Sequence, residues 1–493
     1  MPLIPLQLPP GVYKNGTDQQ SAGRWADASL VRWSEGVMKP VGGWDAFTAS
    51  AVGAPVRGSL GWRDNAGTLR MAAGTYNKLV YIGQQGDIVD ISPASLVAGR
   101  VDASANTAFG GGLYGTGSFG TPRTATDSVL PPTVWSMDTF GDQLLAVSPD
   151  DGRLVTWDNN PANDATVVAG APIDNRAVVV TEERFAMLLG ADGDPRKVAW
   201  GDQESLSVWA AAATNQAGDF TLQTSGSLMT AARVRGQTLI LTDVDTHTAT
   251  YIGPPFVFGF ERVGTNCGII APDAAASVNG GLMWMGRSGF YTFNGGAVDR
   301  LPCDVADYVF SRLNFAQKGK VTAICLAPQN EVWFFYPSGT ENDSYVAYNY
   351  LEQHWSVGTL ARTSGLECGI FERPLWFDVD GKLWRHETGT SYPGSARPFA
   401  ESGPFQLGAG DQVMSATSLI PDEKTQGDVQ VTFKTRFYPN GTERSYGPYL
   451  PANPTDVRFT GREVRMRVEG RDAQPASWRW GIPRVDAVAG GRR

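Results

Sequence analysis

Cysteine is scarce in this chain, with four residues among 493. The four are widely spaced and include no CxxC pair: Cys267, Cys303, Cys325 and Cys368. A Cys/His zinc site needs closely spaced ligands, and only three histidines are present to complement these thiols. We therefore expect free, buried thiols, no metal site and no other cofactor.

Catalytic signatures are missing as well. The sequence has no GxSxG, HExxH or GxxxxGKS/T motif, and no serine or cysteine signature lies near a histidine. The histidines are expected to be surface or core residues: His247, His354 and His386.

Paired carboxylates that could hydrolyse a glycan are the remaining enzymatic option. Glu182 and Glu183 are adjacent, and adjacent strand residues point to opposite faces. Asp192 and Asp194 flank a glycine, where aspartate is typical of a turn. We therefore predict no catalytic residue and a protein that is not an enzyme.

An excess of positive charge and long apolar runs are also lacking. The formal net charge is −9, whereas proteins that grip nucleic acid carry basic patches. No apolar run approaches the roughly 20 residues that span a bilayer. The proline-rich start lacks the basic region of a signal peptide. We expect a soluble protein that is synthesised in the cytoplasm and has no membrane-spanning segment.

Turn formers and aromatic residues are abundant instead. The chain has 58 Gly, 31 Pro, 15 Trp, 15 Tyr and 22 Phe. This composition is typical of an all-β protein with many turns. The length exceeds that at which a single hydrophobic core stops growing, so we expect more than one core.

Pairs of short apolar segments joined by glycine turns recur along the middle of the chain. Such turns supply the positive φ that tight hairpins need. They fall at Gln85–Gly86, Asp151–Gly152, Asp192–Gly193, Asn294–Gly295, Ser338–Gly339 and Asp380–Gly381. Three intervals between turn glycines measure 41, 44 and 42 residues, and one of 102 fits two units with a hairpin near 242–249. A four-stranded propeller blade takes about 40–50 residues.

The repeat predicts an all-β fold, a β-propeller of about seven blades with a C-terminal antiparallel β-sandwich. Six or eight blades are alternatives, and an irregular stack of sandwiches is the competing interpretation. One helix is expected at 304–313, with Asp304 as its N-cap. The predicted domains are an extended N-terminal segment that packs on the propeller (1–55), the propeller with a Gly-rich loop insertion near 101–132 (56–396), and the sandwich (397–493).

Local patterns refine this picture. Val464, Met466 and Val468 alternate with Arg465 and Arg467, which predicts a strand with one buried and one solvated face. Asp378-Val-Asp380-Gly381 is a fragment of a calcium loop without its downstream glutamate, and we interpret it as a hairpin turn. Five tryptophans beside the hairpins are expected to pack between blades, and not to stack on sugars: Trp135, Trp200, Trp333, Trp376 and Trp384.

The first fifty residues are the most distinctive part of the sequence. They contain the pattern Arg-Trp-x-Asp-x-x-Leu-Val-Arg, followed by Gly-Gly-Trp. Its residues are Arg24, Trp25, Asp27, Leu30, Val31, Arg32, Gly42, Gly43 and Trp44. This opening and the end Trp478–Asp486 resemble the tail hub or nozzle proteins of short-tailed bacteriophages, also called packaged-DNA stabilisation proteins. Between the two ends the resemblance is one of architecture.

The resemblance implies a structural protein of the virion tail. It implies a homo-oligomeric ring, a hexamer, that extends the DNA channel below the portal and adaptor. The ring retains packaged DNA and passes it during ejection, without binding the double strand tightly. Partners implied are the adaptor or head-completion protein and the tail needle or fibre proteins. Two alternatives are a receptor-binding or polysaccharide-degrading tail protein, and a tail component of a siphophage or gene-transfer particle.

The Gly-rich loop offers a hypothesis for gating. Residues 109–120 carry few bulky side chains, so this loop is able to close a bore or interlock with a neighbour. We nominate Phe109, Leu113, Tyr114 and Phe119 as its anchoring or gating side chains. Deleting 109–120 is expected to give particles that assemble but leak DNA or eject it poorly.

Overall fold

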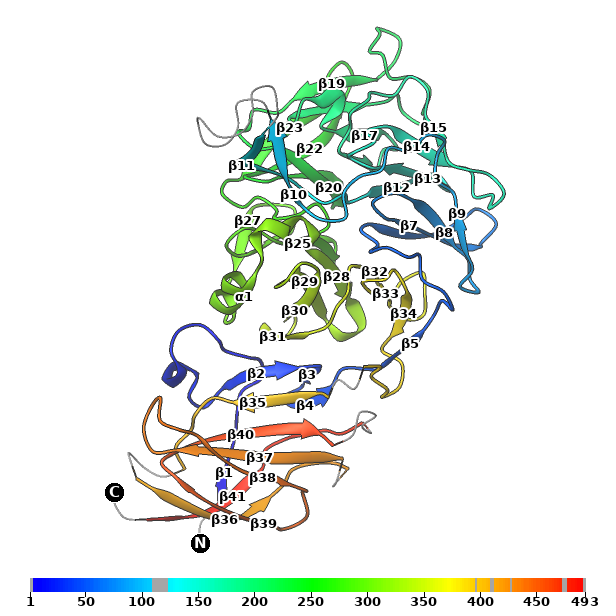
Figure 1. Cartoon of the computed structure of the whole chain (residues 1–493). Coiled ribbons are helices and arrows are strands. Elements are labelled where there is room, and N and C mark those ends of the chain that lie inside the picture. The colour runs from blue at the N-terminus through cyan, green and yellow to red at the C-terminus, as the bar shows by residue number, and fades with distance from the viewer. Residues whose placement is uncertain are drawn as a thin grey trace.

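The chain is built almost entirely from β-strands in small antiparallel sheets (Figure 1). The structure, a computed structural model, describes residues 3–108, 123–394, 397–407, 412–425, 428–471 and 477–490. Seven four-stranded sheets form a propeller, and two further sheets form a sandwich beside it. No helix within the described ranges is long and apolar enough to cross a membrane.

The first four blades are simple meanders in which each strand pairs antiparallel with the next. Blade 1 contains β6 (Ser59–Arg63), β7 (Leu69–Gly74), β8 (Leu79–Ile82) and β9 (Ile88–Asp90). Blade 2 contains β12 (Ser136–Phe140), β13 (Gln143–Val147), β14 (Leu154–Trp157) and β15 (Thr166–Val167). Blade 3 contains β16 (Ala177–Val180), β17 (Ala186–Leu189), β18 (Lys197–Trp200) and β19 (Gly218–Thr221). Blade 4 contains β20 (Leu228–Val234), β21 (Gln237–Thr242), β22 (Thr246–Gly253) and β23 (Val257–Gly264).

Blades 5 and 6 are meanders of the same kind, whereas blade 7 ends with a strand taken from the start of the chain. Blade 5 contains β24 (Ala275–Val278), β25 (Gly281–Met285), β26 (Phe290–Phe293) and β27 (Val298–Leu301). Blade 6 contains β28 (Thr322–Leu326), β29 (Glu331–Pro337), β30 (Asn342–Asn349) and β31 (His354–Thr359). Blade 7 contains β32 (Ser364–Leu366), β33 (Leu375–Phe377), β34 (Leu383–His386) and β5 (Trp44–Ala46).

The seven sheets close into a wheel. The first strands of neighbouring blades contact one another around an axis, and β32 of blade 7 returns to β6 of blade 1. In blade 7, Trp44 of β5 lies opposite His386 of β34. The propeller with about seven blades is thereby confirmed, and the seventh blade depends on a strand more than 300 residues away from its other three.

Aromatic side chains fill the space between adjacent blades. Trp157 of blade 2 contacts Trp62 and Tyr81 of blade 1, with ring centroids 6.3 and 5.1 Å apart. Trp333 of blade 6 lies 5.5 Å from Trp376 of blade 7. Such pairs contribute about 0.5–1.5 kcal/mol each beyond the apolar area that they bury. Four of the five expected tryptophans are buried, and the fifth is half-buried: Trp135, Trp200, Trp333 and Trp376, then Trp384.

Most of the expected turn glycines adopt the left-handed backbone. Five have φ between +69° and +95°: Gly86, Gly152, Gly193, Gly295 and Gly381. The sixth turn, between β29 and β30, is stabilised differently, because the Ser338 backbone N–H donates to Asp343 at 2.9 Å. The Asp378 carboxylate accepts from the backbone N–H groups of Asp380 and Lys382, so this segment is a hairpin turn, as predicted.

The helix expected at 304–313 exists, but its start differs from the prediction. Helix α1 spans Ala306–Arg312, and its N-cap is Val305, without a side-chain capping bond. Asp304 is instead recruited by the N-terminal segment, since its carboxylate pairs with Arg24 at 2.5 Å. The long-range ion pair therefore replaces the local cap that the sequence predicted. The remaining helices of the described ranges are short 3-10 segments: η1 (Asp18–Ser21), η2 (Ala191–Gly193), η3 (Phe315–Lys320) and η4 (Ala327–Gln329).

The insertion near 101–132 begins and ends as a β-hairpin between blades 1 and 2. Its strands β10 (Ser104–Ala108) and β11 (Arg123–Leu130) pair antiparallel, with Ser104 opposite Leu130. The nominated gating residues lie outside the described residues: Phe109, Leu113, Tyr114 and Phe119.

The sandwich combines C-terminal strands with strands from the start of the chain. One sheet has the order β1-β41-β36-β39 and the other β2-β35-β40-β37-β38. The N-terminal strands in these sheets are β1 (Leu3–Pro5) and β2 (Trp25–Ser29), while β3 (Val31–Ser34) and β4 (Val37–Pro40) pair with each other in a separate two-stranded sheet. The C-terminal strands are β35 (Phe399–Ser402), β36 (Met414–Ile420), β37 (Val429–Arg436), β38 (Arg444–Tyr449), β39 (Thr455–Gly461), β40 (Glu463–Gly470) and β41 (Arg484–Ala489).

This arrangement corrects the expectation for the N-terminal segment. It does not merely pack on the propeller, because β1 and β2 belong to the sandwich sheets and β5 belongs to blade 7. In Figure 1 the dark-blue strands β2 and β3 lie on the side of the sandwich that faces the wheel, and β2 contacts β31, the outermost strand of blade 6. The start of the chain therefore connects the sandwich to the propeller by contributing strands to both.

Candidate functional site

The residues of the N-terminal motif converge on the joint between blades 6 and 7. Arg32 of β3 is 5% exposed, and its guanidinium donates two hydrogen bonds to Glu387, at 2.8 and 2.7 Å. The same guanidinium lies 3.1 Å from Glu331, the first residue of β29. Burial favours a raised pKa for Glu387, but the Arg32 charge and its hydrogen bonds outweigh this and lower that pKa. Three separate parts of the chain thus share one buried ion cluster.

The motif glycines are required by space. A Cβ atom on Gly42 would lie 2.5 Å from the Cα of Glu387, and one on Gly43 would lie 2.3 Å from the carbonyl oxygen of Ser391. Both approaches are to backbone atoms, which have no rotamer with which to move aside. The glycines therefore let β5 approach the last blade closely enough to pair with β34.

Trp44 anchors this added strand in an aromatic cluster. It is 5% exposed, stacks on His386 with centroids 5.2 Å apart, and meets Tyr392 edge-on at the same distance. Burial and the charge of Arg362 lower the pKa of His386 well below its ordinary value, so that this histidine is a neutral core residue. All three histidines are buried, in agreement with the core alternative: His247, His354 and His386.

The other half of the motif docks the N-terminal loop against the region of α1. Arg24 pairs with Asp304, and its guanidinium lies 4.6 Å from the ring centroid of Tyr13. Asp27 pairs with Lys14 at 2.7 Å. Trp25 is buried, with its ring centroid 6.0 Å from that of Trp33. Arg24 therefore joins the N-terminal loop to the propeller, while Asp27 and Trp25 stabilise the N-terminal segment itself.

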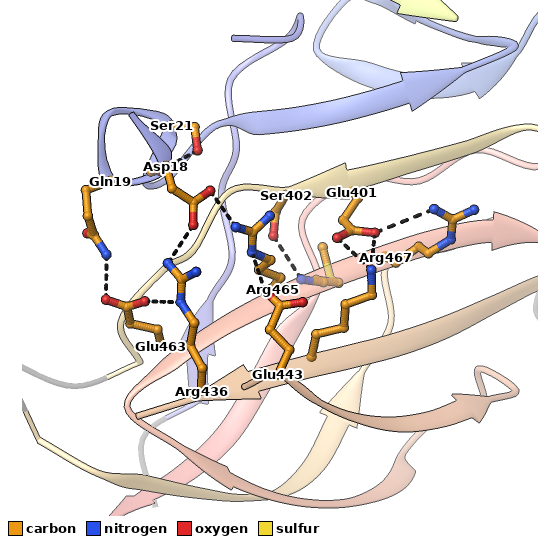
Figure 2. Close-up of polar contacts among 12 residues, drawn as sticks. Asp18, Gln19, Ser21, Glu401, Ser402, Arg436, Glu443, Glu463, Arg465 and Arg467 are labelled. Carbon is orange, nitrogen blue, oxygen red and sulfur yellow. Dashed lines mark hydrogen bonds and ion pairs between the residues drawn. The ribbon is translucent and has the colours of Figure 1, made fainter. Parts of the chain in front are cut away.

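Below the motif, a network of ion pairs joins the N-terminal segment to the outer face of the sandwich (Figure 2). We call it the seam network; it contains Asp18, Glu401, Lys434, Arg436, Glu443, Glu463, Arg465 and Arg467. Asp18 of η1 contacts Arg436 at 2.6 Å and also Arg465. Glu401 accepts two hydrogen bonds from Lys434, both of 2.8 Å, and lies 3.5 Å from Arg467.

The seam network corrects the expected solvated face of β40. Val464, Met466 and Val468 are fully buried, as predicted. The side chains of Arg465 and Arg467 are only 18% and 25% exposed, because the N-terminal segment covers this face. A cleft of about 300 Å³ remains beside them, lined by charged groups such as Lys14, Asp18 and Glu401 that already form ion pairs.

The expected pairs of carboxylates do not form a site. Glu182 and Glu183 lie in the turn between β16 and β17, and not on a strand as the prediction assumed. Asp192 pairs with Lys197 at 2.9 Å, and Asp194 accepts from the backbone N–H of Arg196 at the same distance. Among the described residues, no group of three or more His, Cys, Asp and Glu side chains is placed to hold a metal ion.

Two acids that sequence reasoning missed line a small cavity on the propeller axis. The carboxylate of Asp138 on β12 accepts from the Arg233 guanidinium at 2.7 and 3.1 Å. Asp273, just before β24, accepts from the Thr322 hydroxyl at 2.6 Å, and burial raises its pKa to about 6. The cavity measures about 130 Å³, which holds a few water molecules but is below the roughly 300–1,000 Å³ of ligand pockets. No local motif marks acids that lie 135 positions apart.

The residues that lead into the β10–β11 hairpin are bonded to η3, the helix that precedes blade 6. The Gln317 side chain accepts from the backbone N–H of Ala103 at 3.0 Å and donates to its carbonyl at 3.3 Å. The fully buried ammonium of Lys320 contacts Asp102 and Glu341, each at 2.5 Å. The insertion is thereby attached to η3, the segment that leads into blade 6.

Comparison with known proteins identifies likeness of fold alone. No family model matches this sequence, and neither does any curated protein. Among solved structures, a streptogramin B lyase is 8% identical, with a TM-score of 0.41 over 70% of this chain and 96% of that one. The virginiamycin B lyase of Staphylococcus aureus is 7% identical, with a TM-score of 0.44 over 70% and 97%. BamB from Moraxella catarrhalis is 12% identical, with a TM-score of 0.30 over 68% and 97%.

Proposed function

We propose that this chain is a structural subunit of a bacteriophage tail, a nozzle or hub protein. In this role it forms a ring that extends the DNA channel below the portal and adaptor, retains the packaged genome and passes it during ejection. The observation that carries the proposal is the use made of the N-terminal motif. Residues that resemble this family, such as Arg32, Gly43 and Trp44, hold the N-terminal segment against the last blade of the wheel.

In a subunit of a ring that bears load, the propeller and the sandwich must keep a fixed position relative to each other. The Arg32 cluster, the β5 strand and the seam network each cross a boundary between parts of the chain. Together they hold the sandwich at a defined position against blade 6.

Ring closure needs contacts between two different surfaces of identical subunits. One surface suited to such a contact lies at the outer edge of blades 3 and 4, on β19, on β22 and β23, and on the turn that joins the last two. Phe256 and Ile252 are 74% and 57% exposed, and Phe220 is 42% exposed and stacks on Phe260 with centroids 4.7 Å apart. We call these four residues the rim patch. Clustered apolar side chains on a surface mark interaction sites.

Imaging of the purified full-length protein by electron microscopy tests this proposal. We expect closed rings, and we expect Phe220→Ser/Phe256→Ser to yield single subunits. Val167→Ser, which changes a 44% exposed residue outside the patch, serves as the control and should leave rings intact. Phage lacking the protein should form heads that lose their DNA. Single subunits at every concentration, heads that keep DNA without the protein, or turnover of a polysaccharide would each refute the assignment.

A further inference from the structure

A cavity of about 580 Å³ opens at one end of the propeller axis, beneath the base of the β10–β11 hairpin. We call it the mouth cavity. Its apolar lining comes from several blades and from η3: Val134, Leu228, Met229, Ile270, Pro272 and Phe315. The volume lies within the range of about 300–1,000 Å³ that is typical of sites for small molecules. Phe315 is 48% exposed, so part of this lining is left uncovered by the described residues.

The rim of the mouth cavity is positively charged, in a chain whose net charge is −9. Three cationic residues line it: Arg100, Arg176 and Lys318. The acid among the lining residues is Asp150, which pairs with Arg100 at 2.5 Å. Arg176 and Lys318 form no ion pair with a described residue. Burial and the nearby Arg287 lower the pKa of Lys318, and the negative charge of Asp243 offsets this only in part, so the ammonium is desolvated without a direct counter-ion. An anion at the rim would supply that counter-ion.

The geometry points to a small amphipathic anion as the ligand of the mouth cavity, a carboxylate or sulfonate head on an apolar body. The head lies at the rim beside Lys318 and Arg176, and the body packs against Leu228, Ile270 and Phe315. The opposite orientation is disfavoured, because the mouth cavity adjoins the axial cavity at Val134 and Pro272, where Asp273, which forms no ion pair with a described residue, would repel an anion when ionised. This inference is independent of the proposed function.

Titration of the full chain with anilinonaphthalene sulfonate, an aromatic anion that fluoresces when desolvated, tests the inference. We expect saturable binding to the wild type, displaced by decanoate but not by decanol. Lys318→Glu/Arg176→Glu should weaken sulfonate binding by about tenfold or more through charge repulsion at a partly desolvated rim. Binding of phenylnaphthylamine, the matching probe without the sulfonate, should change by less than about twofold. Phe315→Ser should weaken both probes.

Two control variants separate the mouth cavity from other surfaces. Lys424→Glu reverses an exposed charge on the sandwich, and Leu351→Ser removes a 69% exposed apolar residue from the β30–β31 turn. Both should bind the sulfonate as the wild type does. Unchanged binding in Lys318→Glu/Arg176→Glu, equal displacement by decanol, loss of binding in a control variant, or absence of binding to the wild type would each overturn the inference.

Discussion

Arg32 and Glu387, 355 positions apart, meet in a two-pronged ion pair whose hydrogen bonds measure 2.8 and 2.7 Å. The pair is buried, and Glu331 completes it from a third element. Removing one partner from a buried cluster leaves an uncompensated charge, whereas replacing the whole cluster with neutral groups does not. The cluster therefore makes an unambiguous test of how the N-terminal segment is held.

Arg32→Met should destabilise the protein by about 3–5 kcal/mol, because it buries two carboxylates without a cation. The triple variant Arg32→Met/Glu331→Gln/Glu387→Gln should recover much of this loss. Denaturant unfolding followed by tryptophan fluorescence measures both. If the triple variant is no more stable than Arg32→Met, charge burial is not the cause.

Gly43→Ala should destabilise the closure of blade 7 by about 1–3 kcal/mol, since the added methyl group meets backbone and cannot be accommodated by a rotamer change. Gly296→Ala is the matched control, because a Cβ there meets nothing within 4 Å and its φ is not in the left-handed region. Thermal unfolding of the two variants gives the comparison. Equal melting temperatures would contradict the steric argument.

Asp18→Asn should release the N-terminal loop from the seam network by removing the charge that Arg436 and Arg465 contact. Burial favours a raised pKa for Asp18, but hydrogen bonds from Arg465 and Arg436 outweigh it and lower the pKa. The stabilisation is therefore present above the ordinary carboxylate range and is lost as the pH falls below it. We expect faster proteolysis near residue 18 in the variant, by a margin that shrinks at about 1 M salt. A margin independent of salt would exclude the ionic explanation.

The parts of the fold that the sequence predicted are those with short-range signals. The turn at Gly381 and the alternation of Val464 with Arg465 are each determined by a few neighbouring residues, and both appear in the structure. The blade count followed from the spacing of such turns. The incorrect N-cap of α1 was also a local inference. It failed because Asp304 forms an ion pair with Arg24, which is distant in the sequence.

The parts that could not be predicted depend on contacts between distant segments. Nothing near Trp44 indicates that it pairs with His386, and nothing near Asp18 indicates Arg436. The mouth cavity likewise exists only where several blades meet, so Lys318 and Arg176 have no shared motif. A single sequence specifies such sites through folding, without displaying them as a pattern.

Asp273 gives the sharpest test of the axial cavity through its dependence on pH. Burial raises its pKa from 3.8 to about 6, so the folded state binds this proton more tightly than the unfolded state. Stability from this group is greatest below the unfolded pKa and falls as the pH rises toward 6. Asp273→Asn keeps an oxygen that accepts from Thr322 and removes the charge. It should therefore stabilise the protein at pH 7.5 by about 1–2 kcal/mol, a value reduced by exposure to the cavity, and have no effect below about pH 4. Denaturant unfolding of the wild type and the variant at pH 7.5 and below about pH 4 tests this prediction. If the ionised Asp273 instead stabilises the fold, the variant will be less stable than the wild type at pH 7.5.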